Sequence, residues 1–169
     1  IVFGDWSSDV CSSDLNPVSD LAYETGYILT VNNLENEEEL VMTESVLNFT
    51  TRAQPVAPVV TFSIENNADS VDVASTVYIN FDKAVRNIDN TALNSDNLPS
   101  VISLTDNDNQ AVAFAASINS LKKMITVDPT ENLAANKTFT LLIQNIESTE
   151  DMPIDRKSTR LNSSHRIRS

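Results

Sequence analysis

The chain has 169 residues, of which 24 are acidic and 11 basic, and its net charge at pH 7 is −13. This charge argues against binding to DNA, RNA or anionic membranes, because neutralising phosphates requires more lysine and arginine than the chain carries. No run of about 18 apolar residues occurs, so the sequence predicts no membrane insertion.

Both ends of the chain resemble translated sequencing-adapter DNA. Residues 5–15 read DWSSDVCSSDL and residues 155–165 read DRKSTRLNSSH. The codons GAT CGG AAG AGC ACA CGT CTG AAC TCC AGT C encode the start of the second peptide, and their reverse complement encodes DWSSDVCSSD. We therefore expect residues 1–15 and 155–169 to be artefactual tails and leave them out of the fold prediction. The alternative is a natural N-terminus with a basic C-terminal tail.

The two tails contain the only cysteine, the only histidine and the only tryptophan of the chain. Without them, residues 16–154 carry six basic and twenty acidic side chains, for a net charge of −14. This body lacks the residues for Cys-His or Ser-His-Asp catalysis and for His- or Cys-ligated zinc. Gly26 is its only glycine, so a glycine-rich phosphate loop is excluded. We therefore do not expect an enzyme.

In chain order, the first predicted elements are two strands near 25–32 and 45–51, joined by an acidic turn. Two strands cannot bury a core by themselves. We interpret residues 16–53 as the C-terminal hairpin of a preceding domain. Residues 54–58 follow as a linker, which Pro55 and Pro58 make extended and fairly stiff.

From Val59 onward the sequence predicts a series of short strands separated by turns. Apolar residues alternate with polar ones, turn signals recur every 8–12 residues, and helical periodicity is nearly absent. This pattern predicts an all-β, antiparallel β-sandwich over residues 59–154. The alternating apolar positions are Val60, Phe62, Ile64, Val71, Val73, Val77, Ile79, Phe81, Ile102, Leu104, Val112, Phe114, Ala116, Ile125, Val127, Phe139, Leu141 and Ile143.

An internal repeat links the two parts of the chain. DLAYETGYILTVNNLENEEE (20–39) aligns with NLAANKTFTLLIQNIESTED (132–151) at a constant offset of 112 residues. This self-similarity predicts a tandem array of domains. The identical pairs are Leu21/Leu133, Ala22/Ala134, Leu29/Leu141, Asn33/Asn145, Glu35/Glu147 and Glu38/Glu150.

Several motifs together resemble the bacterial Ig-like domains of the S-layer (SbsA-like) type. They are a Pro-x-Val-x-Phe strand at 58–62, a strand ending in Phe-Asp-x-Ala-Val at 81–85, and a Pro-x-x-x-Leu corner at 129–133 before Phe139. The resemblance implies an Ig-like sandwich on an extracellular or cell-surface bacterial protein. That family closes with a last strand, which the repeat places near 155–163. Because those residues belong to the suspected tail, we expect the closing strand to be missing and the domain to be truncated.

Calcium is the one cofactor that the sequence leaves open. Asp106, Asp108 and Asn109 offer hard oxygen ligands from a turn, and Asp82 with Asp89 and Asn90 offers a second set. Neither set has the glycine or the distal bidentate glutamate of a dedicated calcium loop. The alternative is a solvated turn whose Asp and Asn side chains cap the backbone.

The sequence thus predicts a non-catalytic, extracellular Ig-like repeat that acts as a spacer or stalk in a larger bacterial surface or secreted protein. Its expected partners are neighbouring Ig-like repeats of the same chain. The alternative is an accessory module, with or without calcium, that binds a polysaccharide or another cell-surface ligand for a secreted hydrolase or adhesin. A third hypothesis is an adhesin repeat stiffened by calcium.

Overall fold

The computed structural model describes residues 17–164, and the chain divides into two units, Ile1–Gln54 and Pro55–Ser169. In the first unit, β1 (Gly26–Val31) pairs antiparallel with β2 (Ser45–Thr50), with Gly26 opposite Thr50. Alternate side chains of β1 are partly buried and every residue of β2 is exposed.

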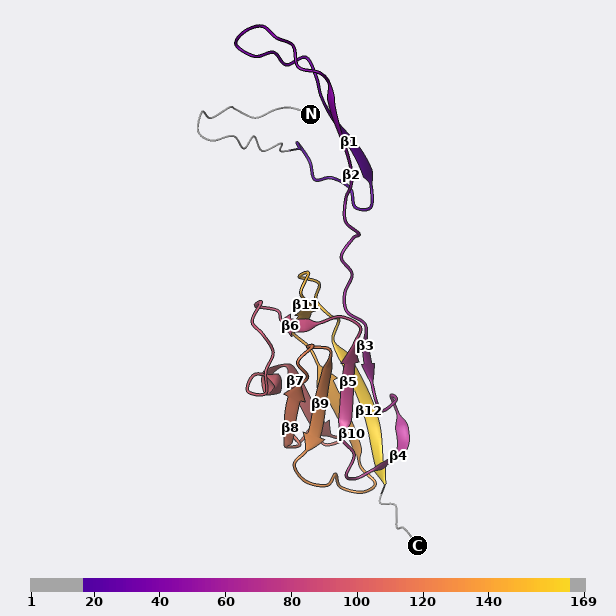
Figure 1. The fold of residues 1–169 in the computed structure, drawn as a ribbon. Coiled ribbons are helices and arrows are strands. Elements are labelled where there is room, and N and C mark those ends of the chain that lie inside the picture. The colour runs from indigo at the N-terminus through magenta and orange to yellow at the C-terminus, as the bar shows by residue number, and fades with distance from the viewer. Residues whose placement is uncertain (1–16, 165–169) are drawn as a thin grey trace. The chain divides into compact units, whose positions relative to one another are not determined.

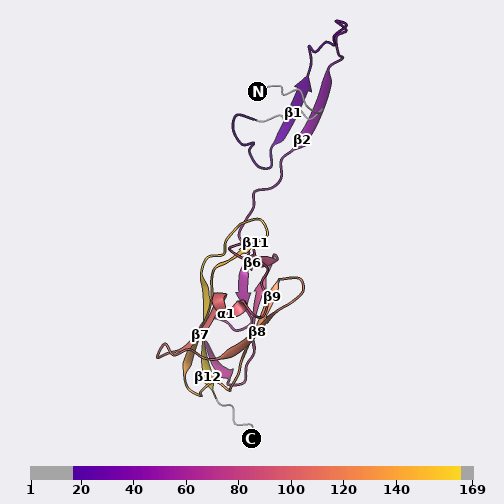
Figure 2. The same cartoon turned by 90° about the vertical axis from the view of Figure 1, so that its left-hand side faces the viewer.

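The second unit is a sandwich of two four-stranded sheets in the orders β4-β12-β10-β7 and β3-β5-β9-β8, with a small β11-β6 pair and one short helix. Figure 2 shows β7 and β12 in one layer and β8 and β9 in the other. The prediction of an all-β sandwich is confirmed. The elements are β3 (Val60–Phe62), β4 (Ala68–Asp72), β5 (Val77–Phe81), β6 (Val85–Asn87), α1 (Leu98–Val101), β7 (Ile102–Asp106), β8 (Phe114–Ile118), β9 (Met124–Pro129), β10 (Thr138–Ile143), β11 (Ile146–Ser148) and β12 (Lys157–Ser164).

The core of the sandwich comes from the alternating apolar residues of both sheets. In β10, Phe139, Leu141 and Ile143 are buried while the residues between them are only partly so. Ile79 of β5 and Ile125 of β9 are fully buried in the facing sheet. A strand places successive side chains on opposite faces of a sheet, so this alternation by itself directs one face of each strand inward.

The expected absence of the closing strand is wrong. Residues 157–164, within the suspected tail, form β12, which pairs antiparallel with β10 and parallel with β4. Thr159, Leu161 and Ser163 point into the core and Arg160 and Asn162 are exposed, so the segment has the period-2 pattern of a strand. Unpaired backbone groups on β10 and β4 favour any extended segment with small or apolar inward side chains. The adapter origin of this sequence stays a prediction.

The chain joins the sandwich at one end and completes its last strand at the other. Val60 of β3 pairs with Phe81 at the end of β5, whereas Asn162 of β12 pairs with Thr138 at the start of β10. The start of β5 lies beside the end of β9, from which residues 130–137 lead to β10. The linker and the end of β12 therefore lie at opposite ends of the domain, and Figure 1 shows β12 running away from the linker.

The hairpin of the first unit reproduces the β10–β12 hairpin of the second at the offset of 112 residues. β1 corresponds to β10 residue for residue, and β2 corresponds to residues 157–162 of β12. The pair Gly26↔Thr50 becomes Thr138↔Asn162, and Val31↔Ser45 becomes Ile143↔Lys157. The isolated bridge Glu35↔Val41 likewise becomes Glu147↔Pro153. The two hairpins therefore have one register.

The equivalence extends to single hydrogen bonds in the turns. The Thr51 hydroxyl donates to the Ala22 carbonyl, and the Ser163 hydroxyl donates to the Ala134 carbonyl. The Asn36 side chain accepts from the N–H groups of Glu38 and Leu40, just as the Ser148 hydroxyl accepts from those of Glu150 and Met152. Positive φ angles also coincide, at Asn33 and Asn145 and at Glu39 and Asp151. The repeat seen in the sequence is therefore also a repeat of local structure.

Candidate functional site

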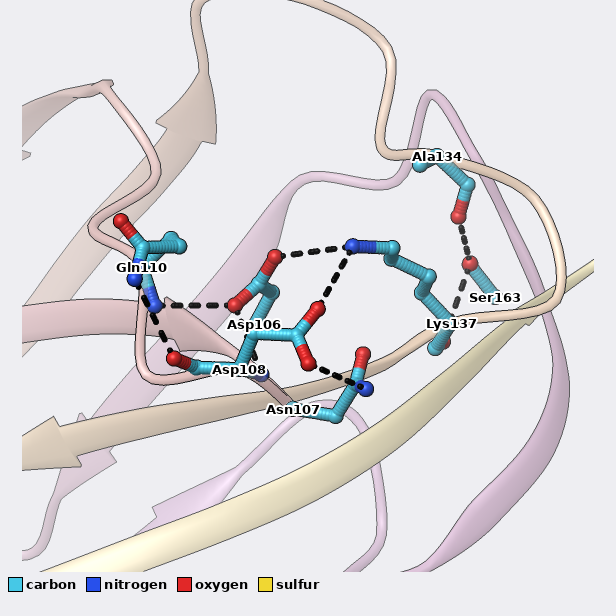
Figure 3. Close-up of polar contacts among 7 residues, drawn as sticks. All are labelled: Asp106, Asn107, Asp108, Gln110, Ala134, Lys137 and Ser163. Carbon is cyan, nitrogen blue, oxygen red and sulfur yellow. Dashed lines mark hydrogen bonds and ion pairs between the residues drawn. The ribbon is translucent and has the colours of Figure 1, made fainter.

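The proposed calcium ligands Asp106 and Asp108 lie together at the turn after β7, where they contact a lysine. Lys137 Nζ is 3.1 Å from Asp106 Oδ2 and 3.2 Å from Asp108 Oδ2. Figure 3 shows this ammonium group between the two carboxylates. Asn109 contributes differently, because it has a φ of 59° and its N–H donates to the Asp106 carbonyl. In this structure the cation that these carboxylates contact is Lys137.

The Asp106 carboxylate also organises the turn itself. Its Oδ1 accepts hydrogen bonds from the N–H groups of Asp108 and Gln110, both at 2.9 Å. The bond from Gln110 and the contact with Lys137 lower the pKa of Asp106 below its usual 3.8. The carboxylates of Asp106 and Asp108, with Asp106 the larger cause, raise the pKa of Lys137 above its usual 10.5. This arrangement is a backbone cap with an ion pair, and the calcium hypothesis stays a prediction.

The second proposed set of oxygen ligands is used in separate local turns. Asp82 Oδ1 accepts from the Val59 N–H at 2.7 Å, which ties the end of the linker to the end of β5. Asp89 Oδ1 accepts from the N–H and the hydroxyl of Thr91, and the hydroxyl bond is the main cause of its lowered pKa. Asn90 occupies the left-handed position of that turn, with a φ of 68°. Within residues 17–164, no three Asp, Glu, His or Cys side chains are arranged to hold a metal ion.

A charged cluster that sequence reasoning missed lies at the linker end of the sandwich. Arg86 of β6 donates through Nε to Glu147 Oε1 of β11 at 3.0 Å, and through a terminal nitrogen to Asp151. Glu147 is only 4% exposed, and Arg86 is the basic side chain that contacts its buried carboxylate. Lys83 Nζ lies 3.5 Å from Glu150 and donates to the Val56 carbonyl of the linker at 3.0 Å. The repeat marked the acids, through the identity of Glu35 with Glu147 and of Glu38 with Glu150, but nothing in the sequence indicated which basic residues they contact.

Exposed aromatic side chains are sparse on the described surface of the sandwich. Tyr78 of β5 is 40% exposed, as expected for a solvent-facing strand residue. Within the described residues of the sandwich, no two aromatic rings stack. Tyr27 and Phe49 do stack, but they belong to the β1–β2 hairpin. Over residues 17–164, no helix has the length and apolar character needed to cross a membrane.

Comparison with known proteins places this sandwich in a family. The sequence profile of the bacterial Ig-like domain matches residues 54–160, more than half of the chain. Domains of this family are generally non-catalytic modules. No curated protein matches the chain.

Solved structures with similar folds include a structure of domains 1–6 of the surface layer protein SbsC, at 15% identity and a TM-score of 0.46 over 66% of this chain and 14% of that one. Another is CopC from Methylosinus trichosporium OB3b, at 14% identity and a TM-score of 0.45 over 66% of this chain and 98% of that one. The chain thus spans about a seventh of the SbsC structure. On the profile match, the chain belongs to the bacterial Ig-like domain family.

Proposed function

We propose that this chain is a non-catalytic spacer module, one repeat of an extracellular stalk on a larger bacterial surface or secreted protein. The observation that supports this most directly is the placement of the linker and the end of β12 at opposite ends of the sandwich. Domains connected in this way follow one another in line, so each added repeat lengthens the stalk. The family assignment and the acidic composition, which keeps neighbouring domains soluble, agree with this role.

The sheet order suits a module that carries tension along its length. A pull on the linker and on the C-terminal end of β12 acts along the strand axis. Inside its sheet, β12 has β10 on one side and β4 on the other, so both ladders are loaded at once. Breaking many hydrogen bonds together requires more force than breaking them one after another.

The linker is fixed to the sandwich by bonds that would transmit this tension. Pro58 is buried, the Val59 N–H donates to Asp82, and Lys83 and Lys123 donate to the carbonyls of Val56 and Asp82. These contacts place the load on the end of β5 and on the turn that follows it. A force applied to the linker is therefore passed directly to the end of β5.

Single-molecule pulling tests the proposal. Attachment at Val56 and at Ser164 loads β12 lengthwise, whereas attachment at Asn136 and at Ser164 peels β12 from β10, because Asn136 lies beside the end of β12. We expect the lengthwise geometry to require several times the force of the peeling geometry. Equal forces would contradict a load-bearing role, and saturable binding of a cell-surface polysaccharide by the full chain would favour the accessory-module alternative.

A further inference from the structure

The β1–β2 hairpin has an apolar face that nothing covers within residues 17–54. Leu47 is 57% exposed and Phe49 39% exposed, and they lie on the same face as the half-buried Leu29. Eight apolar side chains contribute to this face and to the turns beside it, and every one of their equivalents in the sandwich is buried. The pairs are Leu21/Leu133, Tyr27/Phe139, Leu29/Leu141, Val31/Ile143, Leu34/Ile146, Met42/Ile154, Leu47/Thr159 and Phe49/Leu161.

The sandwich shows what covers such a hairpin. The inward side chains of β10 and β12 pack in one core with those of β5 and β9 in the facing sheet. Since the two hairpins share register, turn bonds and inward apolar positions, the same kind of sheet fits the β1–β2 hairpin. Residues 17–25 also match residues 129–137, which lead from the end of β9 in the facing sheet into β10. The sheet that would pack on the apolar face of the hairpin is therefore expected to precede Pro17 in the chain.

Charge complementarity identifies the cover more closely. Glu35, Glu38 and Glu39 of the hairpin turn correspond to Glu147, Glu150 and Asp151. In the sandwich those three acids contact Arg86 and Lys83, which follow β5. Among the described residues, none of the three hairpin glutamates forms an ion pair with a basic side chain, and all three are exposed. A matching cover would carry a lysine and an arginine three residues apart after the strand equivalent to β5.

We propose that the β1–β2 hairpin docks onto a four-stranded sheet of the β3-β5-β9-β8 kind, with a Lys-x-x-Arg segment opposite Glu35, supplied by a preceding segment of the same polypeptide. Together they form a complete Ig-like domain. The inference rests on the proposed function only in treating the hairpin as part of a repeat. The pulling experiment loads only residues between Val56 and Ser164, which exclude the hairpin, so either proposal can fail without the other.

The test is a chimera in which a copy of residues 55–128 replaces residues 1–16 directly before Pro17. We expect hydrogen exchange of the β1–β2 amides to slow to the rate of global unfolding, because an isolated hairpin opens at almost no cost. The calorimetric unfolding enthalpy should about double, since it scales with the number of folded residues. A second variant, in which residues 17–52 replace residues 129–164 in the full chain, should also unfold cooperatively.

Charge variants of the chimera separate the specific fit from general burial. Glu35→Gln should lower the melting temperature of the first domain, whereas Glu37→Gln, at the position of the exposed Thr149, should leave it unchanged. Hairpin amides that exchange as fast in both hybrid proteins as in the original chain would overturn the proposal. Protection that grows with the concentration of the original chain would also overturn it, because the occupant would then be a second copy.

Discussion

The two hairpins of this chain have the same register and the same turn bonds but differ in what lies against them. Leu141 of β10 is fully buried under the facing sheet, while its counterpart Leu29 is only partly covered. The ladder bonds are satisfied in both, so hydrogen bonding alone does not separate them. Local sequence therefore determines the shape of a hairpin, and burial of its apolar face determines how much free energy that shape contributes.

The largest expected effect comes from deleting β12 by ending the chain at Ile154. This exposes the core side of β10 and an unpaired strand edge, which should cost several kcal/mol of a total near 5–15. We expect no cooperative melting transition in circular dichroism. Deleting residues 1–54, which removes the equivalent β2, should leave the melting temperature of the sandwich unchanged. A shortened protein that still melted like the full chain would show that β12 does not contribute to the core.

Truncating equivalent leucines sharpens the comparison. Leu141→Ala should destabilise the sandwich by about 2–5 kcal/mol, because it removes fully buried methyl groups and leaves a cavity. Leu29→Ala should change the unfolding free energy by less than about 0.5 kcal/mol, as substitutions on exposed surfaces do. Urea denaturation followed by the sandwich signal measures both. Similar losses at the two sites would mean that the hairpin is covered in solution.

A smaller effect is expected at the buried ion pair. Glu147→Gln removes the charge that Arg86 contacts in a site with little access to water, and should cost about 1–3 kcal/mol. Glu35→Gln, at the equivalent exposed position, should be neutral in the same urea titration. Arg86→Met tested together with Glu147→Gln should cost less than the sum of the single changes, and full additivity would argue against coupling of the two side chains.

The smallest effect concerns the Lys137 pair, which the hairpin lacks because Thr25 stands at that position. The lowered pKa of Asp106 contributes stability that is present above pH 3.8 and lost as the pH falls through the folded-state pKa. The raised pKa of Lys137 contributes stability that is present below pH 10.5 and lost as the pH rises through its folded-state pKa. Lys137→Met should flatten the pH dependence of the melting temperature in both windows. An unchanged profile would contradict the pairing.

The strands were predictable because alternation and the repeat offset both report on local backbone geometry. The offset even located the closing strand at 155–163, and the error was to infer from the origin of those residues that they could not fold. Their inward positions hold Thr159, Leu161 and Ser163, which fit between β4 and β10 whatever encoded them. Context from neighbouring strands decided the outcome more than the propensity of the segment itself.

The charged cluster at Arg86 and the lysine at Asp106 were beyond the sequence for a different reason. Arg86 and Glu147 are 61 residues apart, and Asp106 and Lys137 are 31 apart, so each pair depends on sheet topology. The acids in the turns were recognised as backbone caps or cation ligands, and only the fold identifies which cation is near. The strands β6 and β11 have three residues each, which is too short for an alternating pattern to show in the sequence.

The position of β12 has a consequence for how the domain is made. The strand of this sandwich that is synthesised last is inserted between β10 and β4, and its contact with β4 spans about 93 residues of sequence. Pairing between residues so far apart in the sequence slows folding. Until β12 is in place, the edges of β10 and β4 that it joins are unpaired. A nascent repeat in this state could capture a matching strand from its neighbour. If such domains follow one another as proposed, sequence differences like those of Leu47 and Phe49 against Thr159 and Leu161 would keep neighbouring domains from exchanging strands during synthesis.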